Sequence, residues 1–231
     1  VAVSESEAET IASSGVVDPA RLRTVPNGID PARVEGAAPA DLAALGLDPG
    51  LPVAAVVGLL YSAKGQDLAL EALAEEGLEG LQLLFVGPGD REPLVALAER
   101  LGVARRVAFT GPRDDVPSLL AAADMLLLPS RWEGMPYVVL EAMAASRAVV
   151  ATPVDGARDL VEDDVTGFLA ASISAPALAA ALRRAVLAGA SRRGTLGAAG
   201  RARLEGAFDV DTMAARLDAV YREALEASGS R

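Results

Sequence analysis

The sequence of 231 residues contains no cysteine and no histidine. These absences exclude disulfides, thiolate zinc sites, cysteine nucleophiles, Ser-His-Asp triads and every imidazole ligand or base. Lysine is almost absent as well, because Lys64 is the single lysine among 21 basic residues. Any chemistry must therefore rest on carboxylates, guanidinium groups, one ammonium group and backbone amides.

Aromatic residues make up only 3 % of the chain, and the formal net charge is −11. Few aromatic rings and a strongly negative surface argue against base stacking and against attraction to nucleic acid, so we expect no nucleic-acid partner. No apolar run approaches the ~20 residues that a transmembrane helix needs, and no secretion signal opens the chain. These features predict a cytoplasmic protein with no transmembrane segment and leave peripheral membrane association open.

Apolar residues make up 52 % of the chain, which is enough to bury the core of one large α/β domain. Apolar runs of strand length alternate with amphipathic stretches of helix length, a pattern typical of βα units on a parallel sheet. We predict one doubly wound α/β domain over residues 1–231, with ligands at the carboxyl ends of its strands. The predicted strands cover residues 21–25, 53–58, 82–86, 106–110, 125–129, 148–151 and 167–170, and the predicted helices cover residues 5–13, 66–75, 92–101, 116–123, 136–145, 157–161, 175–188, 195–205 and 212–227.

The segment from Ser130 to Glu141 follows a predicted strand and leads into a predicted helix. Pro136 suits the first position of that helix, because proline has a helical φ and lacks the amide that would be unpaired there. The amides of Tyr137 and Val138 would then point outward at the positive end of the helix dipole. This arrangement predicts an anion site, for which a phosphate is the natural ligand.

Two carboxylates belong to the same segment, Glu133 in the loop and Glu141 inside the helix. Both could reach one crevice at different depths, where carboxylates suit the recognition of sugar hydroxyls. The structural alternative is that Glu133 caps the helix while Glu141 lies on its solvated face. The spacing alone leaves both interpretations open.

The single lysine, Lys64, follows another predicted strand, at the same edge of the sheet. An ammonium group there can meet a diphosphate as a point charge. The alternative is an ordinary surface lysine, which is less expected in a chain that otherwise uses arginine.

Two other patterns have simpler interpretations. Gly87 and Gly89 show G-x-G spacing but lack the third glycine of a dinucleotide fingerprint, so we interpret them as a strand-to-helix turn. Asp209 and Asp211 have the D-x-D spacing of metal-dependent sugar transferases of another fold. They precede a predicted helix, so we interpret either Asp209 or Asp211 as its N-cap.

Taken in order, these segments resemble the donor-binding half of the family 4 (group 1) retaining glycosyltransferases, which have the GT-B fold of two facing Rossmann-like domains. The resemblance covers essentially the whole chain, and the order and spacing of its motifs make it specific. The segments that carry it are residues 3–5 (VSE), 25–30 (VPNGID), 57–58 (VG) with 64–65 (KG), 85–89 (FVGPG), 107–111 (VAFTG), 123–124 (AD), 129–136 (PSRWEGMP), 140–144 (LEAMA) and 166–169 (TGFL).

The resemblance implies a role for each matching position. Glu133 would be the catalytic carboxylate that touches the transferred sugar, Glu141 would bind the nucleotide ribose, and Lys64 would bind the donor diphosphate. Members of the family commonly need no divalent metal, so we expect no metal and no cofactor besides a UDP-sugar or GDP-sugar donor. The remaining donor-binding positions would be Gly134, Met135, Pro136, Tyr137 and Val138, with Gly111 and Arg113 bordering the base.

Two positions depart from the family pattern. Leu59 stands where an arginine usually follows the strand-end glycine, which removes half of the expected Arg/Lys clamp on the diphosphate. A charge-assisted hydrogen bond contributes about 1.5–3 kcal/mol, or roughly 10- to 150-fold in affinity, so its loss predicts a weaker enzyme or a noncatalytic homologue. Met135 replaces a usual aromatic residue, which we interpret as a change in packing.

Family members are nearly twice as long as this chain, because they carry an N-terminal acceptor domain that nothing here matches. The chain also starts at Val1 rather than methionine, so we expect it to be a piece of a longer protein. We predict that this chain binds a nucleotide sugar, transfers a hexose only together with the missing acceptor domain, and is inactive by itself.

Other functions fit the sequence less well. The absence of histidine disfavours a GT-B relative that cleaves or epimerises a nucleotide sugar. A dehydrogenase would need the missing glycine fingerprint, and a pyridoxal phosphate enzyme would need Lys64 as its Schiff base. A noncatalytic nucleotide-sugar-binding or regulatory homologue is the main alternative, because of Leu59. The base, the sugar, the acceptor and the oligomeric state stay open, since UDP and GDP donors both fit.

Overall fold

Six short strands form one parallel sheet in the computed structural model, which describes residues 1–229, with side chains up to residue 226. Neighbouring strands follow the order β3-β2-β1-β4-β5-β6. This order confirms the predicted doubly wound fold, and each predicted strand from residue 53 onward ends within one residue of an observed one. The strands are β1 Val53–Val57, β2 Gln82–Val86, β3 Val107–Phe109, β4 Met125–Leu128, β5 Ala148–Ala151 and β6 Gly167–Leu169.

The strand order reverses between β1 and β4. The chain builds outward from β1 to β2 and β3 on one side, and then returns to add β4, β5 and β6 on the other. The loops after β1 and β4 therefore leave neighbouring strands on either side of a crevice. Doubly wound sheets bind their ligands at such a switch point.

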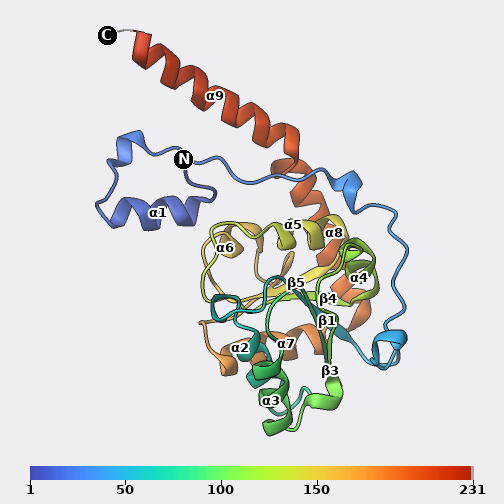
Figure 1. Cartoon of the computed structure of the whole chain (residues 1–231). Coiled ribbons are helices and arrows are strands. Elements are labelled where there is room, and N and C mark those ends of the chain that lie inside the picture. Colours follow the sequence, from blue (N-terminus) through green and yellow to red (C-terminus); the bar gives the residue numbers. More distant parts are fainter. Residues whose placement is uncertain (230–231) are drawn as a thin grey trace.

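Helices cover both faces of the sheet (Figure 1), and each face has its own core of buried side chains. In β1, Val56 packs in the core that contains Leu70, while the preceding Ala55 packs in the core that contains Leu140. Because successive strand residues face opposite sides, a strand buried on both faces is an uninterrupted apolar run. One face is covered by α2 Gln66–Leu73, α3 Glu92–Arg100 and α7 Ala175–Leu187, and the other by α4 Val116–Ala122, α5 Tyr137–Ala144 and α6 Ala157–Leu160. α8 Gly189–Ala207 reaches both cores, through Leu196 and Leu204.

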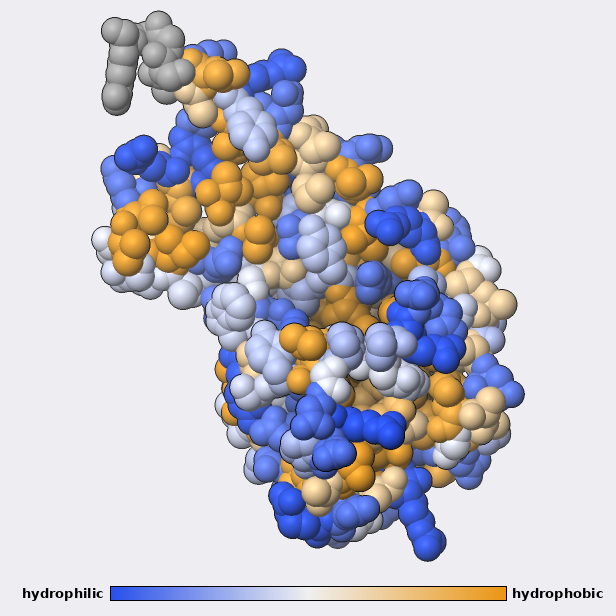
Figure 2. Space-filling model, viewed as in Figure 1, coloured by the Kyte–Doolittle hydropathy of each residue, from blue (hydrophilic) through white to orange (hydrophobic). Residues whose placement is uncertain are grey.

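Two helices, α1 Glu5–Ser13 and α9 Val210–Gly229, lie outside these layers (Figure 1). Arg23 and Glu223 form an ion pair, with 2.9 Å between Nε and Oε2, that joins the segment after α1 to α9. Figure 2 shows apolar surface over both helices. α9 is 20 residues long, but no helix within residues 1–229 is both long enough and apolar enough to cross a bilayer.

Residues 21–25 do not form the predicted strand. Arg21 ends the 3-10 turn Pro19–Arg21, and the described residues 22–25 form one β-bridge, between Ala2 and Thr24. The partner segment cannot extend the pairing, because it enters α1 three residues after Ala2. Two helices also start earlier than predicted, α8 by six residues and α9 by two. The other 3-10 turns are Pro31–Arg33, Ala43–Leu45, Ser62–Lys64 and Ala104–Arg106.

Candidate functional site

The loops after β1 and β4 lie against each other at the switch point. We call them the Lys64 loop (residues 58–65) and the Glu133 loop (residues 129–136). Gly65 ends a 3-10 turn of the first loop with a φ of +67°, and a Cβ atom there would lie 2.0 Å from the Pro129 carbonyl oxygen of the second. Glycine satisfies both the backbone conformation and the close approach. This contact places Lys64 beside the loop that carries Glu133.

Lys64 and Glu133 form an ion pair in this crevice. The Glu133 side chain is buried, and its Oε1 accepts hydrogen bonds from Lys64 Nζ and from Ser130 Oγ, both at 2.7 Å. A buried carboxylate is costly unless it is paired, and these two donors offset the loss of solvation. In the described part of the chain, the other oxygen, Oε2, has no hydrogen-bond partner. Half of the carboxylate is therefore available to a ligand.

The structural alternative for Glu133, a cap for the following helix, is wrong. α5 has Pro136 as its N-cap, with φ −75° and ψ 116°, and no side-chain cap is made by the described residues. The prediction that Pro136 is the first helical residue is therefore corrected by one position, because its ψ is extended. Tyr137 and Val138 become the first two helical residues, and among residues 1–229 their amides have no hydrogen-bond partner. They form an open pair of donors at the positive end of α5.

The residues between Glu133 and α5 are held by close packing. A Cβ atom on Gly156 would lie 2.1 Å from the Gly134 carbonyl oxygen, so the backbones of these two glycines touch. Met135 is buried, and its carbonyl oxygen accepts a hydrogen bond from Asn27 Nδ2 at 3.1 Å. The interpretation of Met135 as a packing residue agrees with this position.

Glu141 lies just over one turn into α5 and is half-buried. Burial raises the pKa of its carboxyl group, and the positive charge of Arg33 opposes that effect in part. No residue that the structure describes donates a hydrogen bond to this side chain. A desolvated carboxylate without a donor is typical of a binding site, which favours the functional interpretation over a solvated helical residue.

A cavity of about 320 Å³ opens at the carboxyl ends of β2 and β3, with Gly111 in its wall. Gly87 donates its amide hydrogen to the Gly111 carbonyl oxygen at 2.9 Å, which joins the loops after these two strands. Arg113 does not line this cavity. Its guanidinium group forms a bidentate pair with Asp115, at 2.7 and 2.6 Å, which raises the pKa of Arg113 and lowers that of Asp115.

The structure adds four residues that the sequence patterns did not single out. Ser130 bonds Glu133 directly, and Thr152 Oγ1 donates to the Ser130 carbonyl oxygen at 2.5 Å. Asp67 and Arg131 form a bidentate pair between the α2 start and the Glu133 loop. A polar residue at each strand end was a usable signal for Ser130 and Thr152, whereas the Asp67–Arg131 pair has no sequence signal.

The interpretation of Asp209 as a helix cap is confirmed. Its Oδ1 accepts from the Thr212 amide at 2.8 Å, and its Oδ2 accepts from the Thr212 hydroxyl at 2.6 Å. These hydrogen bonds lower the pKa of Asp209.

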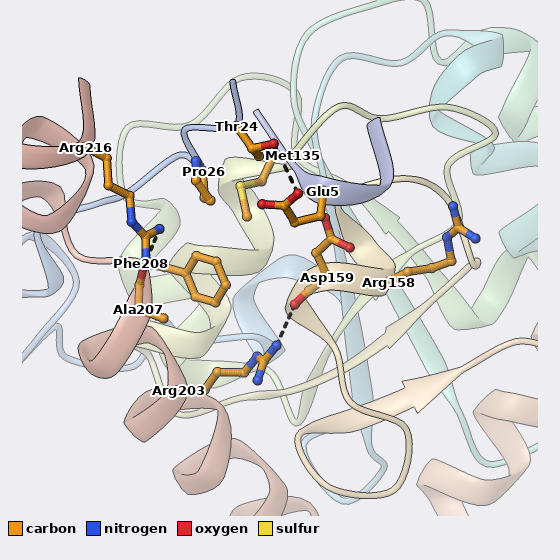
Figure 3. A pocket seen from close by; sticks show the side chains of 10 residues that line it. All are labelled: Glu5, Thr24, Pro26, Met135, Arg158, Asp159, Arg203, Ala207, Phe208 and Arg216. Carbon is orange, nitrogen blue, oxygen red and sulfur yellow. Dashed lines mark hydrogen bonds between the residues drawn. The ribbon is translucent and has the colours of Figure 1, made fainter. Parts of the chain in front are cut away.

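A second cavity, of about 630 Å³, lies between α1, α6, α8 and α9 (Figure 3). Its acidic and basic groups are mixed: Glu5 accepts from the Thr24 hydroxyl at 3.2 Å, and Arg203 donates to the Asp159 carbonyl oxygen at 2.8 Å. Neither Lys64 nor a described residue of the Glu133 loop other than Met135 lines it.

Comparison with known proteins identifies the family. The sequence profile of the "Glycosyl transferases group 1" matches residues 52–187, more than half of the chain. D-inositol 3-phosphate glycosyltransferases from Mycobacterium sp. (strain KMS) and Segniliparus rotundus are 39 % and 36 % identical to this chain over 174 and 182 residues. The matches cover 71 % and 74 % of this chain but 39 % and 40 % of those proteins. The chain thus spans about two fifths of the length of these curated relatives.

Solved structures share the fold over almost the whole chain. Sucrose-phosphate synthase from Thermosynechococcus elongatus has a TM-score of 0.82 at 28 % identity, covering 98 % of this chain and 58 % of that one. Anabaena Alr3699/HepE, solved in complex with UDP and glucose, has a TM-score of 0.84 at 26 % identity, covering 96 % of this chain and 62 % of that one. Both proteins match the α/β domain built around the switch point. With the sequence profile, these similarities establish that the chain belongs to the group 1 glycosyltransferases.

Proposed function

We propose that this chain is the donor-binding domain of a retaining glycosyltransferase that takes a hexose from a UDP-sugar or GDP-sugar. The observation that carries the proposal is the ion pair between Lys64 and Glu133 at the switch point. A sugar diphosphate needs a cation for its phosphates and an acceptor for its sugar hydroxyls, and this pair offers both. The bound UDP and glucose in the HepE structure support the same assignment.

The diphosphate would take its hydrogen bonds from two sources. The open amides of Tyr137 and Val138 point outward from the α5 start, where the helix dipole favours an anion. The Lys64 ammonium group is a mobile point charge that can turn from Glu133 to a phosphate oxygen. Glu133 would then keep its bond from Ser130 and accept from a hydroxyl of the transferred sugar.

The nucleoside would lie along the same edge of the sheet. Glu141, half-buried and without a donor among the described residues, would accept from the ribose hydroxyls. The base would enter the cavity of about 320 Å³ beside Gly111. Arg113, held by Asp115, would border the base from outside that cavity.

In the transfer step, the bond between the anomeric carbon and the leaving phosphate oxygen breaks, and the acceptor oxygen bonds to the anomeric carbon on the same face. The acceptor hydroxyl gives its proton to the leaving diphosphate. Lys64 and the α5 amides offset the negative charge that develops on the diphosphate. These groups supply the stabilisation without a metal ion.

The acceptor would be held by an N-terminal domain outside this chain. The chain spans about two fifths of its curated relatives, which supports such a division. The chain by itself would therefore bind the donor without transferring the sugar. Transfer from a UDP-sugar or GDP-sugar to a defined acceptor by these 231 residues alone would contradict this part of the proposal.

A noncatalytic binding or regulatory homologue is the second candidate. Leu59 is 48 % exposed at the edge of the site, where it offers no charge to a diphosphate. Nucleotide binding without sugar transfer by the complete two-domain protein would favour this alternative.

Calorimetric titration of the chain with UDP, GDP and ADP tests the donor site. We expect one nucleotide to bind selectively, with affinity lowered roughly tenfold or more in both Lys64→Ala and Glu141→Ala, because each loses a charge-assisted hydrogen bond. Arg105→Ala and Glu99→Ala are matched controls, since both residues are exposed and lie outside the site. Affinity unchanged by the site variants, or no binding by the folded chain, would overturn the assignment.

A further inference from the structure

A second ion pair joins the Glu133 loop to the α2 start. Arg131 lies two residues before the site carboxylate, and Asp67 lies three residues after the site lysine. Both Nη–Oδ distances of this bidentate pair are 2.7 Å. Arg131 Nη1 also donates to the Ser62 carbonyl oxygen at 2.6 Å, and the Arg131 amide donates to the Ala63 carbonyl oxygen at 2.8 Å. One residue of the Glu133 loop therefore bonds both the Lys64 loop and the α2 start.

The two ion pairs would respond differently to an anionic ligand. The Lys64 ammonium group has a flexible stem and no fixed geometry, so phosphate oxygens can compete with Glu133 for it. The Arg131 guanidinium group is planar, and its two parallel hydrogen bonds to Asp67 match the carboxylate. A ligand that captures Lys64 breaks the first pair and leaves the second one intact.

The Asp67–Arg131 pair also keeps its charge over a wide pH range. The hydrogen bond from Arg131 lowers the pKa of Asp67 by more than its partial burial raises it. The same contact raises the pKa of Arg131. Since the pKa of Asp67 is lower in the folded state, the contribution of the pair is present above the ordinary aspartate range and is lost as pH falls through the lowered value.

We propose that Asp67 and Arg131 are positioning residues that hold the Lys64 loop and the Glu133 loop in register while Lys64 exchanges Glu133 for the diphosphate of the donor. The exchange rests on the proposed function, whereas the restraint on the loops concerns this chain alone. An ordinary surface ion pair would contribute little to stability and nothing to the site. Loss of a positioning pair would change loop motion and nucleotide affinity, whereas loss of an ordinary surface ion pair would change neither.

Three variants and one control separate these roles. Asp67→Asn and Arg131→Gln each remove one charge of the pair, while Arg131→Lys keeps the charge and loses the bidentate geometry. Asp163→Asn is the matched control. Asp163 and Arg184 form another exposed bidentate pair, at 3.0 and 3.1 Å, outside both loops.

Trp132 makes the position of the Glu133 loop measurable. It is the single tryptophan of the chain, it lies between Arg131 and Glu133, and its side chain is 66 % exposed. Time-resolved fluorescence anisotropy of Trp132 in the ligand-free chain measures the nanosecond motion of this loop. Calorimetry with UDP and GDP measures affinity, and circular dichroism confirms the fold of each variant.

We expect the three variants to increase the amplitude of Trp132 motion and to weaken nucleotide binding about tenfold, since a misplaced binding group loses its alignment. Asp163→Asn should match the wild-type chain in both measurements. A change in only one of the two, or in neither, overturns the proposal, because positioning requires both. If the wild-type chain binds no nucleotide, the proposed function fails, and Trp132 anisotropy alone decides whether the pair restrains the loops.

Discussion

Thr152 donates a hydrogen bond from its hydroxyl group to the carbonyl oxygen of Ser130 at 2.5 Å. Ser130 donates in turn to the Glu133 carboxylate at 2.7 Å. Thr152 directly follows β5, and Ser130 follows β4, so two neighbouring strands fix the orientation of the site carboxylate. These two buried hydrogen bonds use different groups of Ser130, its backbone carbonyl and its hydroxyl, so both the backbone and the side chain of this residue are fixed.

The first prediction concerns Ser130→Ala. The variant removes one of the two donors to a buried carboxylate, so we expect the free energy of unfolding to fall by about 1–3 kcal/mol. Urea denaturation measures the change. Ser172→Ala, which alters an exposed hydroxyl, should shift the same quantity by less than about 0.5 kcal/mol. Equal stabilities of the two variants would contradict a supporting role for Ser130.

The ion pair of the site gives a second prediction. Lys64→Met leaves the Glu133 charge buried with Ser130 as its remaining donor, so we expect a loss of about 1–3 kcal/mol in unfolding free energy. Adding Glu133→Gln removes the buried charge, and the double variant should recover part of the loss. Urea denaturation of the wild-type chain, Lys64→Met, Glu133→Gln and the double variant gives a coupling energy between the two residues, expected at about 0.5–3 kcal/mol. Strictly additive effects would show that the two groups do not interact in solution.

The third prediction is a pH dependence at Glu141. Burial raises the pKa of this group in the folded state, so the folded chain binds the proton more tightly than the unfolded chain does. Stability therefore falls as pH rises from the ordinary glutamate value, about 4.3, through the raised value. Glu141→Gln should be more stable than the wild-type chain at neutral pH and equal to it at acidic pH.

Thermal unfolding of both proteins between acidic and neutral pH measures the difference. Glu99→Gln, at an exposed position of α3, controls for the loss of one negative charge. A wild-type chain as stable as Glu141→Gln at every pH would show that Glu141 is not desolvated.

A fourth prediction concerns Leu59→Arg, a variant that restores the arginine that the family pattern has next to the strand-end glycine. Leu59→Arg should tighten binding of UDP or GDP by roughly 10- to 150-fold, because a guanidinium group would add a charge-assisted hydrogen bond to the diphosphate. Leu51→Arg adds the same charge at the opposite end of β1, where it should leave the affinity unchanged. Calorimetry compares the two variants, and equal affinities would place the diphosphate away from residue 59.

The central strands are predictable from the sequence, whereas the start of α8 is not. β2 and β5 match their predicted bounds, because both are buried along their whole length. β5 is therefore an uninterrupted apolar run, and β2 is one from Leu83 onward. α8 begins among glycines that disfavour a helix locally. The six residues that the prediction missed include Arg193, which is buried and donates to Asp124 Oδ1 at 2.9 Å. That contact comes from tertiary packing, which local propensity does not contain.

The candidate site is also predictable only in part. The predicted strand ends were enough to place Lys64 and Glu133 at one edge of the sheet. Their hydrogen bond spans 69 positions, and the Asp67–Arg131 pair spans 64, distances over which no spacing rule applies. The partner of Arg113 is instead close in the sequence. Asp115, two positions away, binds its guanidinium group outside the cavity.

The scarcity of lysine has a practical consequence for following this site. Lys64 carries the single side-chain amine of the chain, 2.7 Å from Glu133, and its side chain is 27 % exposed. Reductive methylation with ¹³C-formaldehyde would therefore label one side chain, and that side chain lies in the crevice. The methyl resonances of the labelled Lys64 would report its exchange between carboxylate and phosphate oxygens, without resonance assignment of the rest of the domain.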